Sequence, residues 1–243
     1  SYGNLEISKI TSEDIMKFLI KVTNGQKQST KKLKYSLLRS FFNFIKDSVD
    51  STLINPCDTP ILRKTFKTPK GLAWTIHGRD VVDEIIFKSN NLRNRLMLEL
   101  MARGGMRIGE VLKLKVKNVH GRKLVLLDPK SGNQTEIVFI PKKVADRLRE
   151  YITSINIEDD NNVFPLGYTR AREIVQNAGK IISVDLKPHD LRRHAATYAS
   201  RSGVPIEIIS KIILRHANLA TTQKYLGKVS DTEAIHWIDN LYR

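Results

Sequence analysis

The sequence places one histidine and one tyrosine nine residues apart, across a short polar turn. His216 and Tyr225 lie in the stretch LRHANLATTQKYL, which covers residues 214–226. Thr221 and Thr222 could start a helix there, because a threonine hydroxyl accepts a hydrogen bond from an unpaired backbone N–H. We expect Tyr225 near the first turn of that helix. Taken alone, such a tyrosine is more often an ordinary half-buried side chain than a reactive group.

Three further stretches supply cationic side chains of the kinds that phosphodiester cleavage requires. They read GMRIGE from Gly105, DPKSGN from Asp128 and HDLR from His189. The planar fork of an arginine binds two phosphate oxygens at once, so Arg107 and Arg192 are candidates for holding a phosphate from two sides.

The remaining groups of the set suit proton transfer and nucleophilic attack. A neutral imidazole can donate a hydrogen bond or carry a proton near neutral pH, which makes His189 and His216 candidates. Lys130, in a predicted turn, could protonate a leaving oxygen as a general acid. A phenol ordinarily ionises near pH 10, so Tyr225 would need this cationic pocket to act as a nucleophile. The set suits cleavage by a tyrosine without a metal or another cofactor.

Each of these residues has an ordinary structural explanation when it is taken singly. Arg107 could be a surface residue at the start of a helix, and His189, which follows a proline, could merely cap one. Lys130 is a lysine in a turn, the least specific of the set. Their combination in this order, within these local patterns, favours the chemical interpretation.

Composition limits the partners and the compartment. The 243 residues suffice for one large or two modest domains, and the formal net charge of +16 favours a polyanionic partner over a generally basic protein. The single cysteine permits no intrachain disulfide and no zinc site built on cysteines, and it is typical of a reducing cytosol. No stretch approaches the roughly 18 apolar residues of a membrane span. We expect a cytoplasmic protein without membrane association.

The first third of the chain predicts two helices and a basic surface. Thr11 and Asp14 have the spacing of a capping box before a helix that ends near Val22. A second helix over residues 30–46 carries an apolar stripe of Leu33, Leu37, Phe41, Phe44 and Ile45. Between residues 26 and 46 there are six basic side chains and no acidic one, which favours a surface that faces DNA phosphates over a merely solvated one. These six are Lys27, Lys31, Lys32, Lys34, Arg39 and Lys46.

The rest of the chain predicts a mainly helical fold with a small antiparallel sheet. Prolines and glycines over residues 67–74 indicate a linker, and helices are expected over 80–88 and 92–103, the latter with Leu92, Leu96, Leu100 and Met101 inward. A short helix at 108–112 precedes three β-like segments, and Lys130 falls at the tip of the hairpin between the last two. The β-like segments cover residues 115–119, 122–127 and 135–140. Further helices are expected over residues 144–155, 171–178, 191–201, 205–214 and 231–243.

Three of these stretches also carry a family resemblance. GGMRIGEVLKL, HDLRRHAAT and LRHANLATTQKYL are closely similar to the motifs of the tyrosine recombinase (phage integrase) family, enzymes that break and rejoin DNA. The resemblance extends from about Thr11 to the C-terminus. It implies a helical core-binding, SAM-like domain over residues 1–66, a linker over 67–74 and a mixed α/β catalytic domain over 75–243. It also implies double-stranded DNA as the partner.

The resemblance implies a role for each motif residue. Arg107 and Arg192 match the arginines that clamp the scissile phosphate, Lys130 the lysine of a β-hairpin, and His189 and His216 the motif histidines. Tyr225 matches the nucleophile that forms a 3′-phosphotyrosyl bond, which stores the energy of the broken bond so that rejoining needs no cofactor. The family works as a homotetramer on two duplexes. The C-terminal helix with Trp237 and Ile238 resembles the one that docks on a neighbouring subunit.

Departures from the family pattern and two alternatives bear on this interpretation. Arg215 stands where the family usually has glycine, and its bulk and charge could slow the enzyme or tighten phosphate binding. The hairpin reads DPKSGN instead of a glycine-rich form, and the N-terminal domain is a helix short. A topoisomerase of type IB would share the pocket but act as a monomer, which an assay of two-duplex synapsis would reveal. A DNA-binding regulator with a relic site is disfavoured by the intact six-residue set.

Overall fold

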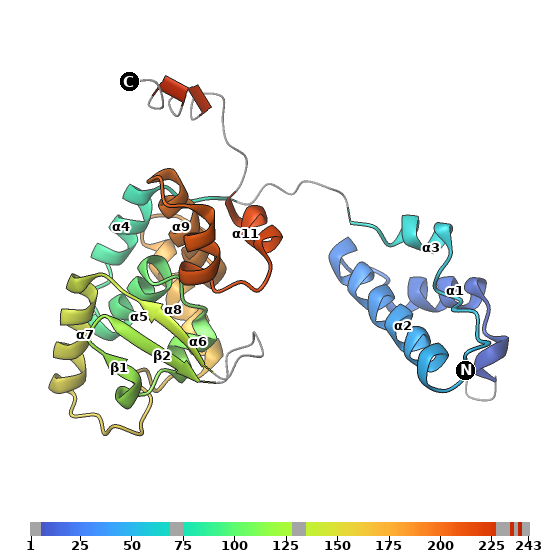
Figure 1. Ribbon diagram of the computed structural model, residues 1–243, viewed down its shortest axis with the longest axis horizontal. Helices are drawn as coiled ribbons and strands as arrows, with labels where there is room; N and C mark the ends of the chain where they lie inside the picture. The colour runs from blue at the N-terminus through green and yellow to red at the C-terminus, as the bar shows by residue number, and fades with distance from the viewer. Residues whose placement is uncertain (1–5, 69–74, 128–134, 227–233, 236–237, 240–243) are drawn as a thin grey trace. The chain divides into compact units, whose positions relative to one another are not determined.

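The computed structural model describes residues 6–68, 75–127, 135–226, 234–235 and 238–239. The chain divides into two compact units, residues 1–72 and residues 73–243, which we call the N-terminal unit and the C-terminal unit. Figure 1 shows helices in both units and the small sheet in the second. The mainly helical class with one small antiparallel sheet, predicted from the sequence, is confirmed. The limits of the predicted domains and the DNA-binding role of the first one stay predictions.

The N-terminal unit consists of a short 3₁₀ turn and three helices. The turn is Ile7–Lys9, and the helices are α1 (Ser12–Val22), α2 (Gln28–Ser48) and α3 (Pro60–Thr65). The predicted capping box of α1 is confirmed. The Thr11 hydroxyl accepts from the backbone N–H of Asp14 at 3.2 Å, and the Asp14 carboxylate accepts from the backbone N–H of Thr11 at 3.0 Å.

The apolar stripe predicted on α2 does not face the core of this unit. Four of its five members are exposed, at 58% for Leu33 and 62% for Leu37, for example. The buried line of α2 is Tyr35 and Phe42 instead, seven residues apart. The Tyr35 ring stacks on that of Phe66 at the end of α3, and its hydroxyl donates to the Cys57 carbonyl at 2.9 Å. These two aromatic rings take the core-facing side, and part of the stripe lines an apolar groove of about 410 Å³ between α1 and α2.

The C-terminal unit contains a three-stranded sheet, with the strands in the order β1-β2-β3 and all neighbours antiparallel. The strands are β1 (Val119–His120), β2 (Lys123–Leu127) and β3 (Thr135–Phe139). The predicted hairpin of β2 and β3 is confirmed. The strand expected over residues 115–119 is largely wrong, because Val116–Asn118 forms a 3₁₀ turn. Its backbone N–H groups bond to the loop around Asn161 instead of to a strand.

Helices make up most of the rest of this unit. They are α4 (Arg79–Phe87), α5 (Leu92–Arg103), α6 (Ile108–Lys113), α7 (Lys142–Ser154), α8 (Tyr168–Lys180), α9 (Pro188–Arg201), α10 (Ile206–Ile208) and α11 (Leu219–Leu226). A π-helical turn, η3 (Ile209–Ile213), directly follows α10. α5 contacts α4, α6, α7 and α9. No helix among the described residues has both the length and the apolar character needed to cross a membrane.

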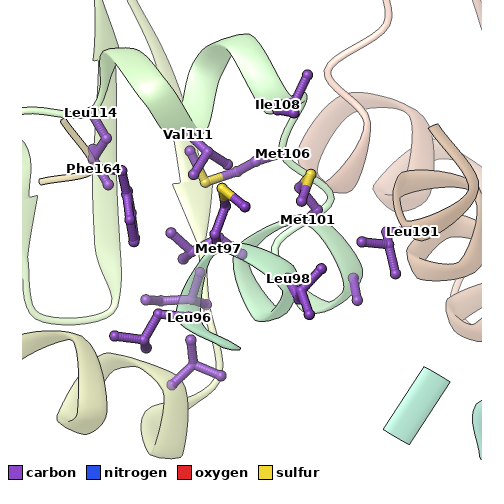
Figure 2. Packing of buried hydrophobic residues seen from close by; sticks show 14 of the residues in the cluster. Leu96, Met97, Leu98, Met101, Met106, Ile108, Val111, Leu114, Phe164 and Leu191 are labelled. Carbon is purple, nitrogen blue, oxygen red and sulfur yellow. The ribbon is translucent and has the colours of Figure 1, made fainter. Parts of the chain in front are cut away.

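Burial on nearly every side makes α5 the axis of the larger core. Leu96, Met97, Leu98 and Met101 are all 0% exposed, and Figure 2 shows them packed with side chains of α6 and α9. Leu92, expected to point inward, is 41% exposed, so that part of the prediction is wrong. Because α5 is packed on nearly every side, its C-terminal end has a fixed position in the core. The turn that follows this end carries Arg107.

Several helices begin earlier than the sequence-based expectation, and in two of them the local cause is visible. α9 begins at Pro188 and not at residue 191, because proline fits the first helical position and the Asp190 carboxylate accepts from the Lys187 backbone N–H at 2.9 Å. α11 begins at Leu219, two residues before the expected threonines. The Asn218 side chain accepts from the backbone N–H two residues later at 2.8 Å and starts the helix.

Two described segments fall within the helix predicted over residues 231–243. Residues 234–235 and 238–239 are helical, and Ile235 and Ile238 are exposed. Trp237, the other apolar side chain of the expected docking helix, lies outside the described residues.

The exposure of Leu92 and the burial of Leu96 make a matched pair of substitutions on α5. Leu96→Ala should lower the free energy of unfolding by about 2–5 kcal/mol, since it leaves a cavity in a closed core. Leu92→Ala should change it by only about 0.5 kcal/mol, as is usual for a surface position. Urea denaturation followed by circular dichroism would measure both. Equal losses would mean that Leu92 belongs to the core after all.

Candidate active site

Five of the six predicted catalytic residues come together in the C-terminal unit. Arg107 precedes α6, His189 and Arg192 belong to the first two turns of α9, His216 follows η3, and Tyr225 lies in the second turn of α11. The Tyr225 ring centroid is 5.1 Å from that of His216 and 6.3 Å from that of His189. The sixth residue, Lys130, lies outside the described residues.

A glycine turn brings Arg107 to this place. α5 ends at Gly104, and Gly105 follows with a φ of +61°, a left-handed conformation that favours glycine. A Cβ atom at Gly105 would lie 2.6 Å from the carbonyl oxygen of Ile213, so only glycine lets the two turns approach this closely. Glu110 then caps the start of α6. Its carboxylate accepts from the Arg107 backbone N–H at 2.8 Å and also pairs with the Arg107 guanidinium.

Arg192 is completely buried between these two turns. Its terminal nitrogens donate to the carbonyl oxygens of Gly105 and Leu214, and one of them lies 3.4 Å from Nε2 of His216. Burial, and then the nearby Arg107 and Arg215, lower the pKa of Arg192 to about 10, so it remains a cation at neutral pH. Its Nε is buried and has no hydrogen-bond partner among the described residues.

A chain of hydrogen bonds fixes the protonation of His216. The Thr222 hydroxyl donates to the Ser210 hydroxyl at 2.9 Å, so its oxygen accepts from Nδ1–H of His216, also at 2.9 Å. This assigns the proton to Nδ1 and leaves Nε2 unprotonated beside Arg192. Burial, together with Arg192 and Arg107, lowers the pKa of His216 to about 4. The imidazole is therefore neutral at physiological pH.

His189 and Arg193 complete the surroundings of the Tyr225 ring. Partial removal from water, and then Arg192 and Arg193, lower the pKa of His189, although the residue is exposed at the surface. The Arg193 guanidinium lies 5.7 Å from the Tyr225 ring centroid, and it pairs with Asp190 at 2.9 Å. The phenol therefore lies beside two neutral imidazoles and a cation. Fixed cations in such a pocket stabilise bound anions.

Several residues of the site were not assigned a role from the sequence. Glu110 could have been found, because it stands three residues after Arg107 at the spacing of a capping box. Arg193 is simply the neighbour of a predicted arginine. Thr222 and Ser210 offered no such pattern. Thr222 was expected to start a helix, but it is 0% exposed and holds His216 instead.

The basic residues predicted to face DNA occupy different positions in the N-terminal unit. Lys32, Arg39 and Lys46 are spaced by seven residues and lie along one line of α2. Arg39 pairs with Asp58 at 2.9 Å, and the Lys34 amine donates to the Val22 carbonyl at 2.9 Å. Lys27 and Lys31 belong to the beginning of α2. Among the described residues of both units, no group of three His, Cys, Asp or Glu side chains could hold a metal ion.

Comparison with known proteins identifies relatives over most of the chain. The model of the phage integrase family matches residues 79–230. The tyrosine recombinase XerA of Pyrococcus horikoshii is 29% identical over 229 residues, which cover 88% of this chain and 75% of that protein. The tyrosine recombinase XerD of Haemophilus ducreyi is 26% identical over 242 residues, covering 89% of this chain and 77% of that protein.

Solved structures share the fold at lower sequence identity. The crystal structure of XerA recombinase matches 99% of this chain and 86% of that chain, with a TM-score of 0.62 and 19% identity. The Tn1549 transposon integrase in complex with transposon right end DNA matches 99% and 88%, with a TM-score of 0.74 and 15% identity. A lambda integrase dimer bound to a core site matches 93% and 86%, with a TM-score of 0.70 and 16% identity.

The hydrogen bond between Thr222 and His216 can be tested without an activity assay. In the parent protein, the ¹⁵N resonances of His216 should show a proton on Nδ1 and a titration midpoint near pH 4, since burial beside Arg192 disfavours the imidazolium. Thr222→Val should remove the preference for Nδ1, because valine offers no acceptor. Thr221→Val, at the exposed neighbouring position, is the control. Identical His216 spectra in the two variants would contradict the assignment.

Proposed function

The chain belongs to the phage integrase family and is a tyrosine recombinase, an enzyme that breaks and rejoins DNA, and we propose that Tyr225 is its nucleophile. The prediction of a site-specific recombinase, preferred over a topoisomerase and over a relic regulator, is confirmed by these relatives. The roles of the individual residues are our proposal. The observation that carries it is the position of the Tyr225 ring between the imidazoles of His216 and His189 and the guanidinium of Arg193.

In the proposed first step the Tyr225 hydroxyl oxygen attacks the phosphorus of the scissile phosphodiester. A bond forms between phosphorus and the phenolic oxygen, and the bond from phosphorus to the 5′ oxygen breaks. The strand is left with a 3′-phosphotyrosyl end and a free 5′-hydroxyl. Attack by the 5′-hydroxyl of another strand reverses the step and releases Tyr225. The number of phosphoester bonds is conserved, so the exchange needs no external energy source.

Arg107 and Arg192 are the groups that we assign to the non-bridging phosphate oxygens. Negative charge accumulates on these oxygens in the transition state, and fixed cations in a site shielded from water stabilise it strongly. The Arg107 side chain is 26% exposed and can reach a bound phosphate. Arg192 brings its charge to the same place from α9, with one terminal nitrogen 3.4 Å from Nε2 of His216.

The proton that leaves Tyr225 needs an acceptor, and the leaving 5′ oxygen needs a donor. Both histidines can accept, because their lowered pKa values keep them neutral near pH 7. Of the two, His216 presents its unprotonated Nε2 to Arg192 at 3.4 Å. That nitrogen already faces a guanidinium, so we assign the role of proton acceptor to His189. Lys130 remains our proposed donor to the leaving oxygen, on the sequence alone.

Double-stranded DNA is the partner that we propose, and a homotetramer on two duplexes is the proposed assembly. The Tn1549 and lambda integrases, which share the fold, were crystallised with DNA, the latter as a dimer on a core site. On this chain, the basic line of α2 is the proposed phosphate contact. Ile235 and Ile238 are 62% and 56% exposed on the C-terminal helix, which supports its docking on a second subunit.

The test of the nucleophile is the covalent adduct itself. A duplex carrying a site selected from random sequences, nicked next to the scissile phosphate, should trap protein on its 3′ end. The adduct should resist denaturation and form in the presence of a chelator. Tyr225→Phe should abolish it, because phenylalanine has no oxygen. Tyr198→Phe, an exposed position on α9, is the control and should react normally. An adduct formed by Tyr225→Phe would transfer the role to another residue.

Salt dependence tests the basic line of α2. Each lost phosphate contact should reduce the slope of log affinity against log salt by roughly 0.9. The double variant Lys32→Ala, Lys46→Ala should therefore flatten the slope by about 1.8. Its control is Lys9→Ala, Lys17→Ala, which removes two exposed lysines that pair with Glu6 and Glu13 in the same unit. An unchanged slope in the first variant would place this line of α2 away from DNA.

A further inference from the structure

We infer that Arg215 is a positioning residue of strand cleavage, which holds Glu110, and through Glu110 the guanidinium of Arg107, in a fixed relation to the His216 turn. The inference rests on the proposed function, because it concerns the same phosphate site. It gives a specific role to the residue that stands where similar proteins usually have glycine.

The backbone at Arg215 explains why glycine is the usual residue and why arginine here requires support. Its φ is +51°, in the left-handed region where a side chain is unfavourable. The π-helical turn η3 delivers the chain into this conformation, and the next N–H, that of His216, bonds to the Ser210 carbonyl at 2.9 Å. A strained residue persists only where its surroundings determine its conformation.

Hydrogen bonds of the Arg215 guanidinium hold the residue in this conformation. It is buried and donates to two carboxylates and two carbonyls. Nε bonds to Glu136 of β3 at 3.2 Å, and one terminal nitrogen bonds to Glu110 at 2.7 Å and to the Gly105 carbonyl at 3.3 Å. The other terminal nitrogen bonds to the Ile213 carbonyl at 2.8 Å. Three separate segments of the chain are therefore joined at one side chain: β3, the start of α6 and the turn before His216.

Glu110 transmits this arrangement to Arg107. One carboxylate oxygen, Oε2, accepts both from the backbone N–H of Arg107 and from Arg215, and the other pairs with the Arg107 guanidinium. Burial alone would raise the pKa of Glu110, but Arg215 and then Arg107 hold it below its usual value, so the carboxylate stays charged. Without Arg215, this nearly buried carboxylate would lose one of its two cations and one of the three hydrogen bonds that orient it.

The same guanidinium also shares a partner with Arg192, since both donate to the carbonyl of Gly105. The Gly105 turn, which leads into Arg107, is therefore held by both Arg192 and Arg215. This fixes the positions of the two proposed phosphate-binding arginines relative to each other. The charge of Arg215 itself faces Glu110 and Glu136, with its side chain only 4% exposed. This arrangement does not support the sequence-based suggestion that Arg215 adds a cation for phosphate binding. Its contribution is geometric.

The test compares two substrates that differ only in the charge of the scissile phosphate. Arg215→Gly removes the side chain while keeping a residue that accepts the positive φ. Single-turnover cleavage of the nicked duplex should fall by roughly 10- to 100-fold. Losses of this size are typical in metalloenzymes when a residue that orients a metal ligand is removed, and we expect the same for a residue that orients Arg107. With an uncharged methylphosphonate at the scissile position, Arg107 has less charge to neutralise. There the variant should stay within about threefold of the parent.

The control is Arg147→Ala on α7, which also leaves a buried carboxylate, Glu99, without its ion pair at 2.6 Å, and which has no role in the proposed site. It should affect both substrates by the same factor. If Arg215→Gly folds poorly by circular dichroism, the double variant Arg215→Gly, Glu136→Gln removes the buried carboxylate left without a partner. Its substrate dependence should be that of Arg215→Gly.

The outcomes separate this inference from the proposed function. Equal losses on the two substrates, or no loss on the ordinary one, would overturn the positioning role while leaving Tyr225 as the nucleophile. A parent protein that forms no adduct with either substrate, while Tyr225→Phe behaves identically, would overturn the proposed function and the inference together. A selective loss on the charged phosphate supports both.

Discussion

A buried guanidinium with no carboxylate of its own needs carbonyl oxygens around it, and Arg192 obtains them from two turns. Gly105 supplies one carbonyl and Leu214 the other. Because both turns bond to one rigid group on α9, the start of α6 and the His216 loop are fixed relative to each other. The π-helical turn η3, the left-handed Gly105 and the left-handed Arg215 all serve this convergence. The site depends on these carbonyl contacts more than on any ion pair.

Three arginines lie close together in this site, so their positive charges repel one another. Carboxylates offset this repulsion for two of the three. Burial, and then the charges of Arg107 and Arg215, lower the pKa of Arg192 to about 10. Glu110 and Glu136 compensate Arg107 and Arg215, while Arg192 is left with carbonyls and an unpartnered Nε–H. Burial, and then the same arginines, lower the pKa of both histidines, so both are neutral near pH 7. A phosphate in this site would relieve the repulsion between the arginines. The repulsion that destabilises the site without an anion would therefore also favour the binding of one.

The N-terminal unit shows a different limit of periodic patterns. α2 carries apolar side chains on two faces, and counting by threes and fours selects the longer stripe of Leu33, Leu37 and Phe41. The core takes Tyr35 and Phe42, because a ring can both fill the space under α3 and, for Tyr35, satisfy the Cys57 carbonyl. Periodicity indicates that a helix is amphipathic, but it does not say which of two apolar faces finds a partner.

The sequence by itself determined most helices, the hairpin of β2 and β3, the capping box of α1 and five side chains that meet in the candidate site, since these follow from local periodicity and motif spacing. It could not determine how the motifs meet. The bond from Thr222 to His216 joins residues six apart, but it exists only because Ser210 buries that hydroxyl. The link from Arg215 to Glu110 and Glu136 spans 105 and 79 positions. Only the tertiary structure decided these contacts, because the identity of a buried charge's partner is set by the packing of distant segments and leaves no spacing in the chain.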